Sequence, residues 1–110
     1  MKIDRQALWK RYNGHCAYCG TEIALNDMQT DHIKPKVFGG DSRPENIMPS
    51  CRSCNHYKRD AAGLEGFREK MNTLHERIEK IYIIPIAIRY GMMDEFELKP
   101  FDGKFYFEKL

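Results

Sequence analysis

Four cysteines in two matched pairs are the residues of this 110-residue sequence whose spacing most clearly indicates chemistry. Each pair encloses two residues, and the four are Cys16, Cys19, Cys51 and Cys54. Two such turns bring four thiolates to one point, a ligand set that is typical of tetrahedral zinc. Disulfides or free thiols are the alternative, but a disulfide scaffold of this size would contain more cysteine. Because four sulfur ligands leave no open position, we expect this zinc to stabilise the fold without taking part in chemistry.

A second set of polar residues lies within and just after the lobe that the zinc would close. Its members are Asp31, His32, Asn46 and Asn55. Since zinc binding brings the cysteine pairs together, we expect the strand that holds Asp31 and His32 to lie against the helix that holds Asn55. A carboxylate and an amide oxygen suit Mg²⁺ or Mn²⁺ better than zinc, and a neutral imidazole beside such a metal activates water. Hydrolysis of a phosphodiester requires both functions.

Basic side chains lie near this set along the chain. They are Lys34, Lys36, Arg43, Arg52, Lys58 and Arg59. The formal net charge is +2, and the excess lies in residues 1–60, which hold ten basic and seven acidic side chains. This balance excludes a histone-like polycation and an acidic tail, and it is compatible with a nucleic-acid partner. We expect the six basic residues to contact phosphates and to confer little sequence preference.

Capping and turn residues predict the elements that carry these sets. A first helix begins after Asp4 and ends at Asn13-Gly14. Two short strands are predicted, at residues 28–33 and 47–48, with a loop rich in glycine and proline between them. A short helix over residues 52–59 begins at the second cysteine pair.

The second half of the chain contains a longer apolar pattern. Its residues alternate between spacings of three and four: Leu64, Phe67, Met71, Leu74, Ile78 and Ile81. The spacing predicts an amphipathic helix that ends before Pro85, with a short helix over residues 86–90 after it. We expect the apolar stripe to pack on the zinc module, the part of the chain that holds both cysteine pairs. A coiled-coil contact within a homodimer is the alternative.

The final segment predicts a β-hairpin with one buried aromatic face. Its strands flank an Asp-Gly turn and hold Phe96, Leu98, Phe105 and Phe107. Together with the helices this predicts an α+β fold in a single domain, residues 1–110. No apolar stretch approaches the roughly twenty residues of a membrane span, so we expect a soluble, cytoplasmic protein.

The cysteine pairs and the polar set together resemble the HNH endonucleases, a family with a ββα-metal core. The positions that carry the resemblance are Cys16-x-Tyr18-Cys19-Gly20, Asp31-His32-Ile33-x-Pro35, Gly39-Gly40 and Asn46-Ile47-x-Pro49-x-Cys51-x-x-Cys54-Asn55-x-x-Lys58. The resemblance implies an HNH core over residues 16–59 with a helical and hairpin extension over residues 60–110. It is strongest to the small, zinc-stapled form found in phages and bacteria. It therefore implies double-stranded DNA as substrate, a bacterial or phage-infected cell as location, and a homodimer or a larger packaging or nuclease assembly as partner.

The same resemblance implies a role for each polar residue. His32 is the general base, Asp31 is a ligand of the catalytic Mg²⁺ or Mn²⁺, and Asn46 positions the loop and holds the His32 ring by hydrogen bonding. Asn55 is the second ligand of that metal. The family usually has histidine at this third signature position, and here asparagine is followed by His56. Neighbours on a helix point about 100° apart, so only one of the two faces the metal. Asn55 is favoured because it keeps the spacing from the preceding cysteine, with His56 as the alternative.

The sequence therefore predicts a metal-dependent endonuclease that hydrolyses DNA. Two other functions stay open: a zinc-stabilised nucleic-acid-binding module without cleavage activity, and an accessory subunit that is active only on a larger enzyme. A binding module needs the cysteines and the basic residues but has no use for His32. The complete polar set therefore argues for the endonuclease.

Overall fold

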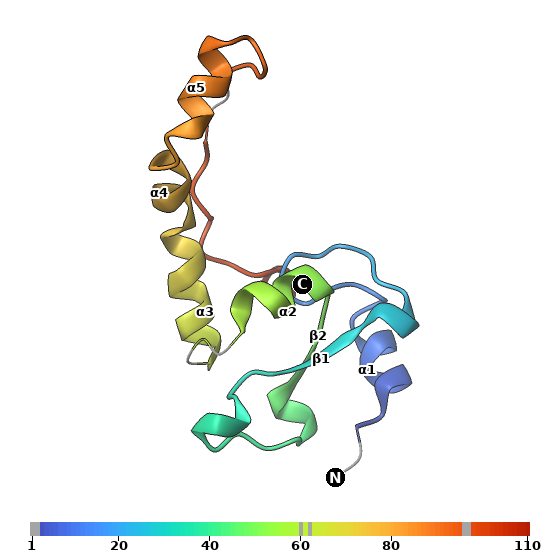
Figure 1. Cartoon of the computed structure of the whole chain (residues 1–110). Helices are drawn as coiled ribbons and strands as arrows, with labels where there is room; N and C mark the ends of the chain where they lie inside the picture. The colour runs from blue at the N-terminus through green and yellow to red at the C-terminus, as the bar shows by residue number, and fades with distance from the viewer. Residues whose placement is uncertain (1–2, 60, 62, 96–97) are drawn as a thin grey trace.

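A small antiparallel sheet lies at the centre of the zinc module, with a helix on each side of it (Figure 1). The computed structural model describes residues 3–59, 61, 63–95 and 98–110. Helix α1 (Arg5–Arg11) packs on one side of the sheet and helix α2 (Arg52–Lys58) on the other. Three further helices, α3 (Gly63–Asn72), α4 (Leu74–Glu79) and α5 (Ile83–Arg89), follow one another away from the sheet and are called the helical arm. The predicted α+β class is confirmed.

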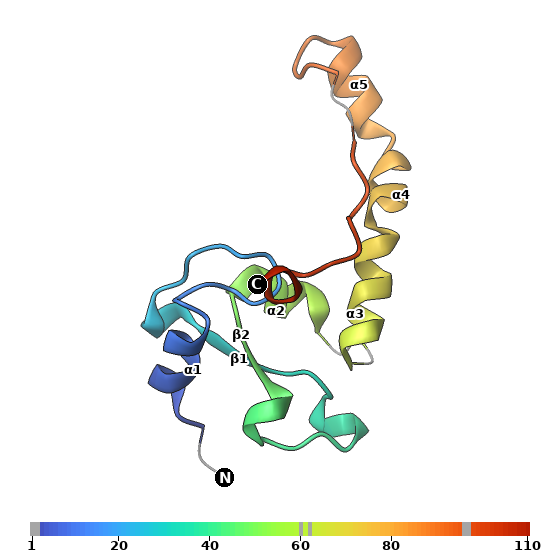
Figure 2. The same cartoon turned by 180° about the vertical axis from the view of Figure 1, so that it is seen from behind.

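The helical arm gives the molecule its elongated shape, with extents of 54 × 29 × 22 Å (Figure 2). The last described segment of the chain returns along the arm to the zinc module, where the C-terminus lies beside α2 (Figures 1 and 2). None of the helices that the structure describes is long and apolar enough to cross a lipid bilayer.

Helix α1 begins where its sequence predicts. Asp4 caps it, and the Asp4 carboxylate accepts a hydrogen bond of 3.0 Å from the Ala7 amide. Leu8, the buried residue of this helix, packs with Met28, just before β1 (Gln29–His32), and with Ile47 on β2 (Ile47–Ser50), and Ile3 packs against the same cluster. These contacts hold α1 against the sheet.

The sheet consists of β1 (Gln29–His32) and β2 (Ile47–Ser50). Their antiparallel register places His32 opposite Ile47 and Asp31 opposite Met48. Both predicted strands are confirmed, and β2 continues through Pro49 because it is an edge strand at which a missing amide is tolerated. The Pro49 carbonyl accepts a hydrogen bond of 2.9 Å from Ala17, which attaches the first cysteine pair to the sheet.

Three aromatic side chains from distant parts of the chain form the main core. Tyr18 lies between the first two cysteines, Phe67 on α3 and Phe105 near the C-terminus. The Tyr18 ring meets the other two edge-on, with centroids at 5.1 and 5.3 Å, and these two stack on each other at 5.0 Å. Aromatic pairs at such separations add stability beyond the area that they bury.

The predicted long helix is broken into α3 and α4 at Thr73. The Thr73 hydroxyl donates back to the carbonyls of Glu69 and Lys70, at 3.2 and 3.3 Å, and such bonds compete with the regular helix pattern. The apolar stripe packs on the zinc module as predicted only at its beginning, where Phe67 is buried. At its other end Ile81 is 43% exposed.

Helix α5 begins three residues earlier than predicted and contains Pro85. The proline lies in the first turn, where its missing amide costs no intrahelical hydrogen bond. The predicted end of the helix is confirmed, because Gly91 adopts the left-handed conformation at φ 71° directly after it.

The predicted C-terminal β-hairpin is wrong in its second strand. Residues Tyr106–Lys109 form a 3₁₀ turn instead. Its backbone amides are used elsewhere, since Tyr106 and Phe107 donate to the carbonyls of Tyr18 and Ala17, and the Glu108 carboxylate accepts from Phe105. Leu98 lies outside any strand, and Phe96 lies outside the described residues.

Candidate active site and metal cluster

The four cysteine sulfurs converge on one point. All four Sγ atoms lie within 4.8 Å of one another, and those of Cys19 and Cys51 are 3.8 Å apart. Four Zn–S bonds of about 2.3 Å in tetrahedral geometry place the sulfurs about 3.8 Å apart, so the cluster fits zinc. Disulfide bonds are excluded, because the cysteines are free and a bonded pair requires about 2.05 Å.

Local backbone features hold both cysteine pairs in this arrangement. Gly20 follows the first pair at φ 80°, and a Cβ there would lie 2.8 Å from the Tyr106 ring, so only glycine fits. Cys51 caps helix α2, where its sulfur accepts a hydrogen bond of 3.4 Å from the Cys54 amide. The predicted zinc ligands are therefore brought together by the two turns that carry them.

Without a bound metal, the thiols of the cluster differ in pKa. The Cys54 thiol donates a hydrogen bond to Cys16, which lowers the pKa of Cys16 to about 4 and raises the pKa of Cys54. Burial raises the pKa of Cys19 to about 11. Thus one thiolate is stabilised by neighbours that stay protonated. Since metal binding requires thiolates, loading the cluster releases protons.

Asp31 is held from two sides on strand β1. Its Oδ2 atom accepts a hydrogen bond of 2.5 Å from the Tyr18 hydroxyl and lies 3.3 Å from Lys58 Nζ. The Asp31 side chain is 9% exposed and that of Lys58 only 1%. Burial and the negative charge of Asp31 raise the pKa of Tyr18 above its usual value, so the phenol stays a donor.

Lys58 departs from its predicted role as a phosphate contact. Its ammonium donates to the Asp31 carboxylate and, at 3.2 Å, to the His32 carbonyl. A buried charge is stable only when it is paired and hydrogen-bonded, and these contacts commit Lys58 to the interior. Lys58 thereby ties helix α2 to both neighbouring residues of β1.

The His32 ring contacts the loop between the strands. Its Nε2 atom lies 3.1 Å from the Ser42 hydroxyl. Next to it, hydrogen bonds from Arg43 hold the pKa of Asp41 below its usual value, so this carboxylate stays ionised. Ser42 was not predicted, because no pattern in a loop of this composition singles out one hydroxyl as the partner of a ring.

Asn46 organises the loop that faces His32. Its amide oxygen accepts from the Lys34 amide at 2.8 Å, and its amide nitrogen donates to the carbonyls of Lys34 and Asp41. The side chain thus joins both ends of the loop. Among the described residues the Asn46 side chain makes no hydrogen bond to the His32 ring, and Ser42 makes that contact instead.

Asn55 and His56 differ in their surroundings on helix α2. Asn55 is half-buried and His56 is exposed. Asn55 lies three residues before Lys58, and residues at this spacing share one helix face, so it lies on the side of α2 that meets β1. Within the described part of the chain its side chain makes no hydrogen bond, which leaves its amide oxygen available.

The side-chain oxygen atoms of Asp31 and Asn55 are suitable ligands for a divalent metal. A carboxylate has about four acceptor positions, and Tyr18 and Lys58 use at most three of them. Together with the Asn55 amide oxygen this makes a hard, oxygen-only ligand set. Lys58 is a cation that already contacts the same carboxylate.

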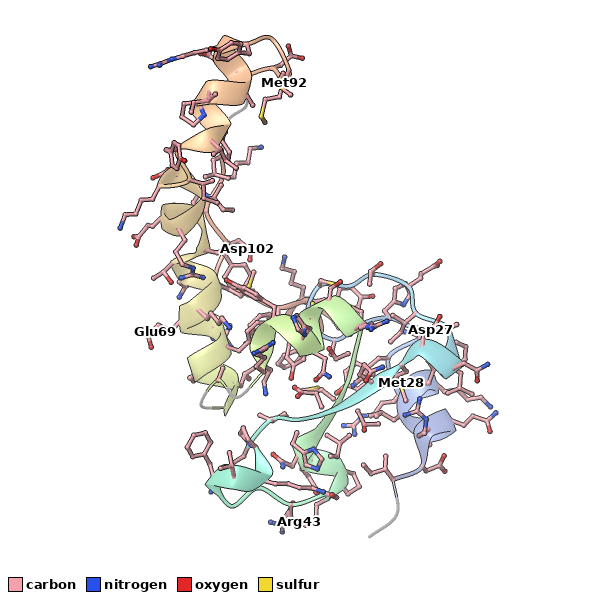
Figure 3. The ribbon with its side chains drawn as sticks, viewed as in Figure 1. Asp27, Met28, Arg43, Glu69, Met92 and Asp102 are labelled. Atoms are coloured by element: carbon pink, nitrogen blue, oxygen red, sulfur yellow. The ribbon has the colours of Figure 1, made fainter. Side chains whose placement is uncertain are left out.

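The remaining predicted phosphate contacts lie at the surface. Lys34, Lys36 and Arg43 are exposed on the loop between the strands, and Arg52 and Arg59 are exposed at the two ends of α2. Arg43, labelled in Figure 3, lies at the edge of the molecule, and its Nε pairs with Asp41 at 2.7 Å. A separate cavity of about 640 Å³ lies between α2, α3 and the C-terminal segment, and it is lined by none of the polar set.

Comparison with known proteins identifies the central part of the chain. Residues 16–60 match the family model of the HNH endonuclease. A CRISPR-associated endonuclease Cas9 from Corynebacterium diphtheriae is 36% identical over 63 residues, which are 52% of this chain and 6% of that protein. The crystal structure of the Type II-C Cas9 enzyme from Actinomyces naeslundii is 24% identical with a TM-score of 0.49, over 76% of this chain and 10% of that one. The chain thus spans a small fraction of these relatives. The resemblance predicted from the sequence is confirmed over residues 16–60, which match the HNH endonuclease family.

Proposed function

We propose that the protein is a metal-dependent endonuclease that hydrolyses phosphodiester bonds of DNA. The observation that carries this proposal is the pair of contacts that Lys58 makes with β1, to the Asp31 carboxylate and to the His32 carbonyl. They hold the Asp31 carboxylate and the backbone of the adjacent His32 against the helix that carries Asn55. The match of residues 16–60 to HNH endonucleases supports the same activity.

His32 acts as the general base in this proposal. Its Nε2 contact with Ser42 fixes the ring, which leaves Nδ1 to take a proton from the attacking water. Asn46 holds the two ends of the loop that carries Ser42, so it positions the base indirectly. Such a positioned base contributes typically about 10²- to 10⁴-fold to a rate.

Asp31 and Asn55 hold the divalent cation, Mg²⁺ or Mn²⁺. When bound there, such a cation offsets the negative charge that develops on the phosphate during hydrolysis. Asp31 supplies the charged ligand and Asn55 the neutral one. Lys58 keeps the carboxylate compensated in the protein without the cation, because an unpaired buried charge is costly.

The proposal is tested by cleavage of supercoiled plasmid with Mg²⁺ or Mn²⁺, with EDTA as the metal-free arm. The wild-type protein is expected to nick or linearise the plasmid only with added metal. Asp31→Asn is expected to reduce the rate at least about 100-fold, because it removes the charged ligand. Asp27→Asn is the matched control, since it makes the same change at an exposed residue outside the site and leaves the rate unchanged. Equal rates for Asp31→Asn and the wild-type protein would overturn the assignment.

Binding to DNA is expected to depend strongly on salt. Each phosphate contact that is lost reduces the slope of log K against log salt by about 0.9 for B-DNA. Lys36→Gln should therefore weaken binding and lower this slope by about 1, whatever the sequence of the duplex. Lys80→Gln, on the helical arm, is the control that leaves the slope unchanged. Fluorescence anisotropy at several salt concentrations measures both, and a slope near zero for the wild-type protein would refute these phosphate contacts.

An accessory role is the second candidate, and the outer end of the helical arm favours it. Large apolar side chains are exposed there: Ile81, Tyr82, Ile83, Ile86, Tyr90 and Met92. Figure 3 shows Met92 at the end of the arm farthest from the sheet. A homodimer or a larger nuclease or packaging assembly would cover this surface. A protein that binds DNA and metal but cleaves only after a partner is added would favour this function.

A further inference from the structure

The residue that joins the zinc cluster to the candidate nuclease site is Tyr18. It lies between Cys16 and Cys19 in the first cysteine pair and is 4% exposed. Its carbonyl accepts a hydrogen bond of 2.9 Å from the Tyr106 amide, and its ring is packed edge-on against Phe67 and Phe105. Backbone and ring are therefore both fixed by contacts that do not involve Asp31.

Core packing does not explain the hydroxyl of Tyr18. A phenylalanine would make the same ring contacts, whereas a buried hydroxyl needs a hydrogen-bond partner. That partner is Asp31 Oδ2, at 2.5 Å. Within the part of the chain that the structure describes, the other oxygen, Oδ1, makes one contact, of 3.4 Å with Lys58 Nζ, which also lies 3.3 Å from Oδ2.

We infer that Tyr18 is a positioning residue, whose hydroxyl orients the Asp31 carboxylate so that Oδ1 faces the catalytic divalent metal. This inference rests on the proposed function, because it requires Asp31 to be a metal ligand. Partners of this kind, which bond to a ligand rather than to the metal, typically affect metal affinity about 10- to 100-fold. The first cysteine turn thus has two roles, since Cys16 and Cys19 bind zinc while Tyr18, one of the two residues between them, positions Asp31.

The test compares Tyr18→Phe with Tyr57→Phe. Both changes remove one hydroxyl from a tyrosine of the zinc module, but the Tyr57 hydroxyl contacts Arg77 and not Asp31. Binding of Mn²⁺ is followed by the electron paramagnetic resonance signal of the free ion, without DNA, so the readout does not depend on activity. Zinc content and the thermal unfolding midpoint are recorded for each protein to show that it is folded.

Tyr18→Phe is expected to weaken Mn²⁺ binding about 10-fold while retaining zinc. Tyr57→Phe is expected to bind Mn²⁺ like the wild-type protein. In plasmid cleavage, Tyr18→Phe should need about 10-fold more metal for half-maximal rate and should approach the wild-type rate at saturation. This split between metal requirement and maximal rate separates positioning from a merely structural role.

The outcomes that overturn the inference are distinct from those that overturn the function. Wild-type protein that binds Mn²⁺ and cleaves, with Tyr18→Phe behaving like Tyr57→Phe, rejects the role of Tyr18 and leaves the endonuclease intact. Wild-type protein that neither binds Mn²⁺ nor cleaves rejects both. If Tyr18→Phe loses zinc, Mn²⁺ binding is compared between Asp31→Asn and the double variant Asp31→Asn/Tyr18→Phe. Equal Mn²⁺ binding by these two proteins supports a role of Tyr18 through Asp31, and weaker binding by the double variant rejects it.

Discussion

Replacement of His32 by alanine is expected to reduce plasmid cleavage by about 10²- to 10⁴-fold, the usual contribution of a general base. The His32 ring makes its hydrogen bond to Ser42 on the exposed loop and contributes nothing to the aromatic core. Zinc content, thermal stability and affinity for DNA should therefore stay close to those of the wild-type protein. Single-turnover cleavage with saturating metal measures the effect on the chemical step.

Two other histidines provide controls for this experiment. His56→Ala changes the exposed neighbour of Asn55 on α2 and is expected to leave the rate unchanged. His75→Ala is the second control, since His75 lies on α4 of the helical arm, outside the site. A large loss of rate in His56→Ala would reverse the choice between Asn55 and His56 as metal ligand. A His32→Ala protein that cleaves at the wild-type rate would remove His32 from the mechanism.

Loss of the zinc is expected to abolish the cooperative unfolding transition of the zinc module. The apparent binding free energy of a structural zinc, about 10–16 kcal/mol, equals or exceeds the whole stability of a typical domain, about 5–15 kcal/mol. Cys16→Ser should have this effect, because Cys16 is fully buried among the other three sulfurs and the aromatic core. Differential scanning calorimetry, with zinc measured by mass spectrometry, tests the expectation.

Acid should produce the same loss without any substitution. Zinc binds thiolates, so lowering the pH protonates the ligands and releases the metal.

Ser53→Ala is the matched control for Cys16→Ser, since Ser53 is exposed beside Cys54 and lies outside the cluster. A Cys16→Ser protein that melts cooperatively at the wild-type temperature would show that the aromatic core folds without zinc.

The parts of the structure that could be predicted from the sequence are those that local chemistry determines. Two Cys-x-x-Cys turns can satisfy four thiolates at one point, and the sulfurs do converge. Asp4 before an apolar periodic segment predicts a capped helix, and α1 begins there. Each of these features depends on residues close together in sequence, apart from the single closure that the metal provides.

The parts that could not be predicted depend on long-range contacts. A lysine in a basic segment has the same appearance whether it contacts phosphate or, like Lys58, pairs with a buried carboxylate 27 residues away. Phe105 and Phe107 alternate as a strand would, but their amides and those of Tyr106 are taken by the first cysteine turn and by Glu108. Tyr18 carried a signal that was available: a tyrosine fixed between two metal ligands needs a partner for its hydroxyl.

The contact between the first cysteine turn and residues 105–107 joins segments that are made far apart in time during synthesis. Both cysteine pairs leave the ribosome well before Phe105 does, so a nascent chain can capture zinc while Tyr18 still lacks one of the two rings that brace it. The carbonyls of Ala17 and Tyr18 likewise wait for the amides of Phe107 and Tyr106. We therefore expect zinc binding to precede the packing of Tyr18 against Phe105, so that a chain still in synthesis holds zinc before the ring and the carbonyl of Tyr18 are fixed.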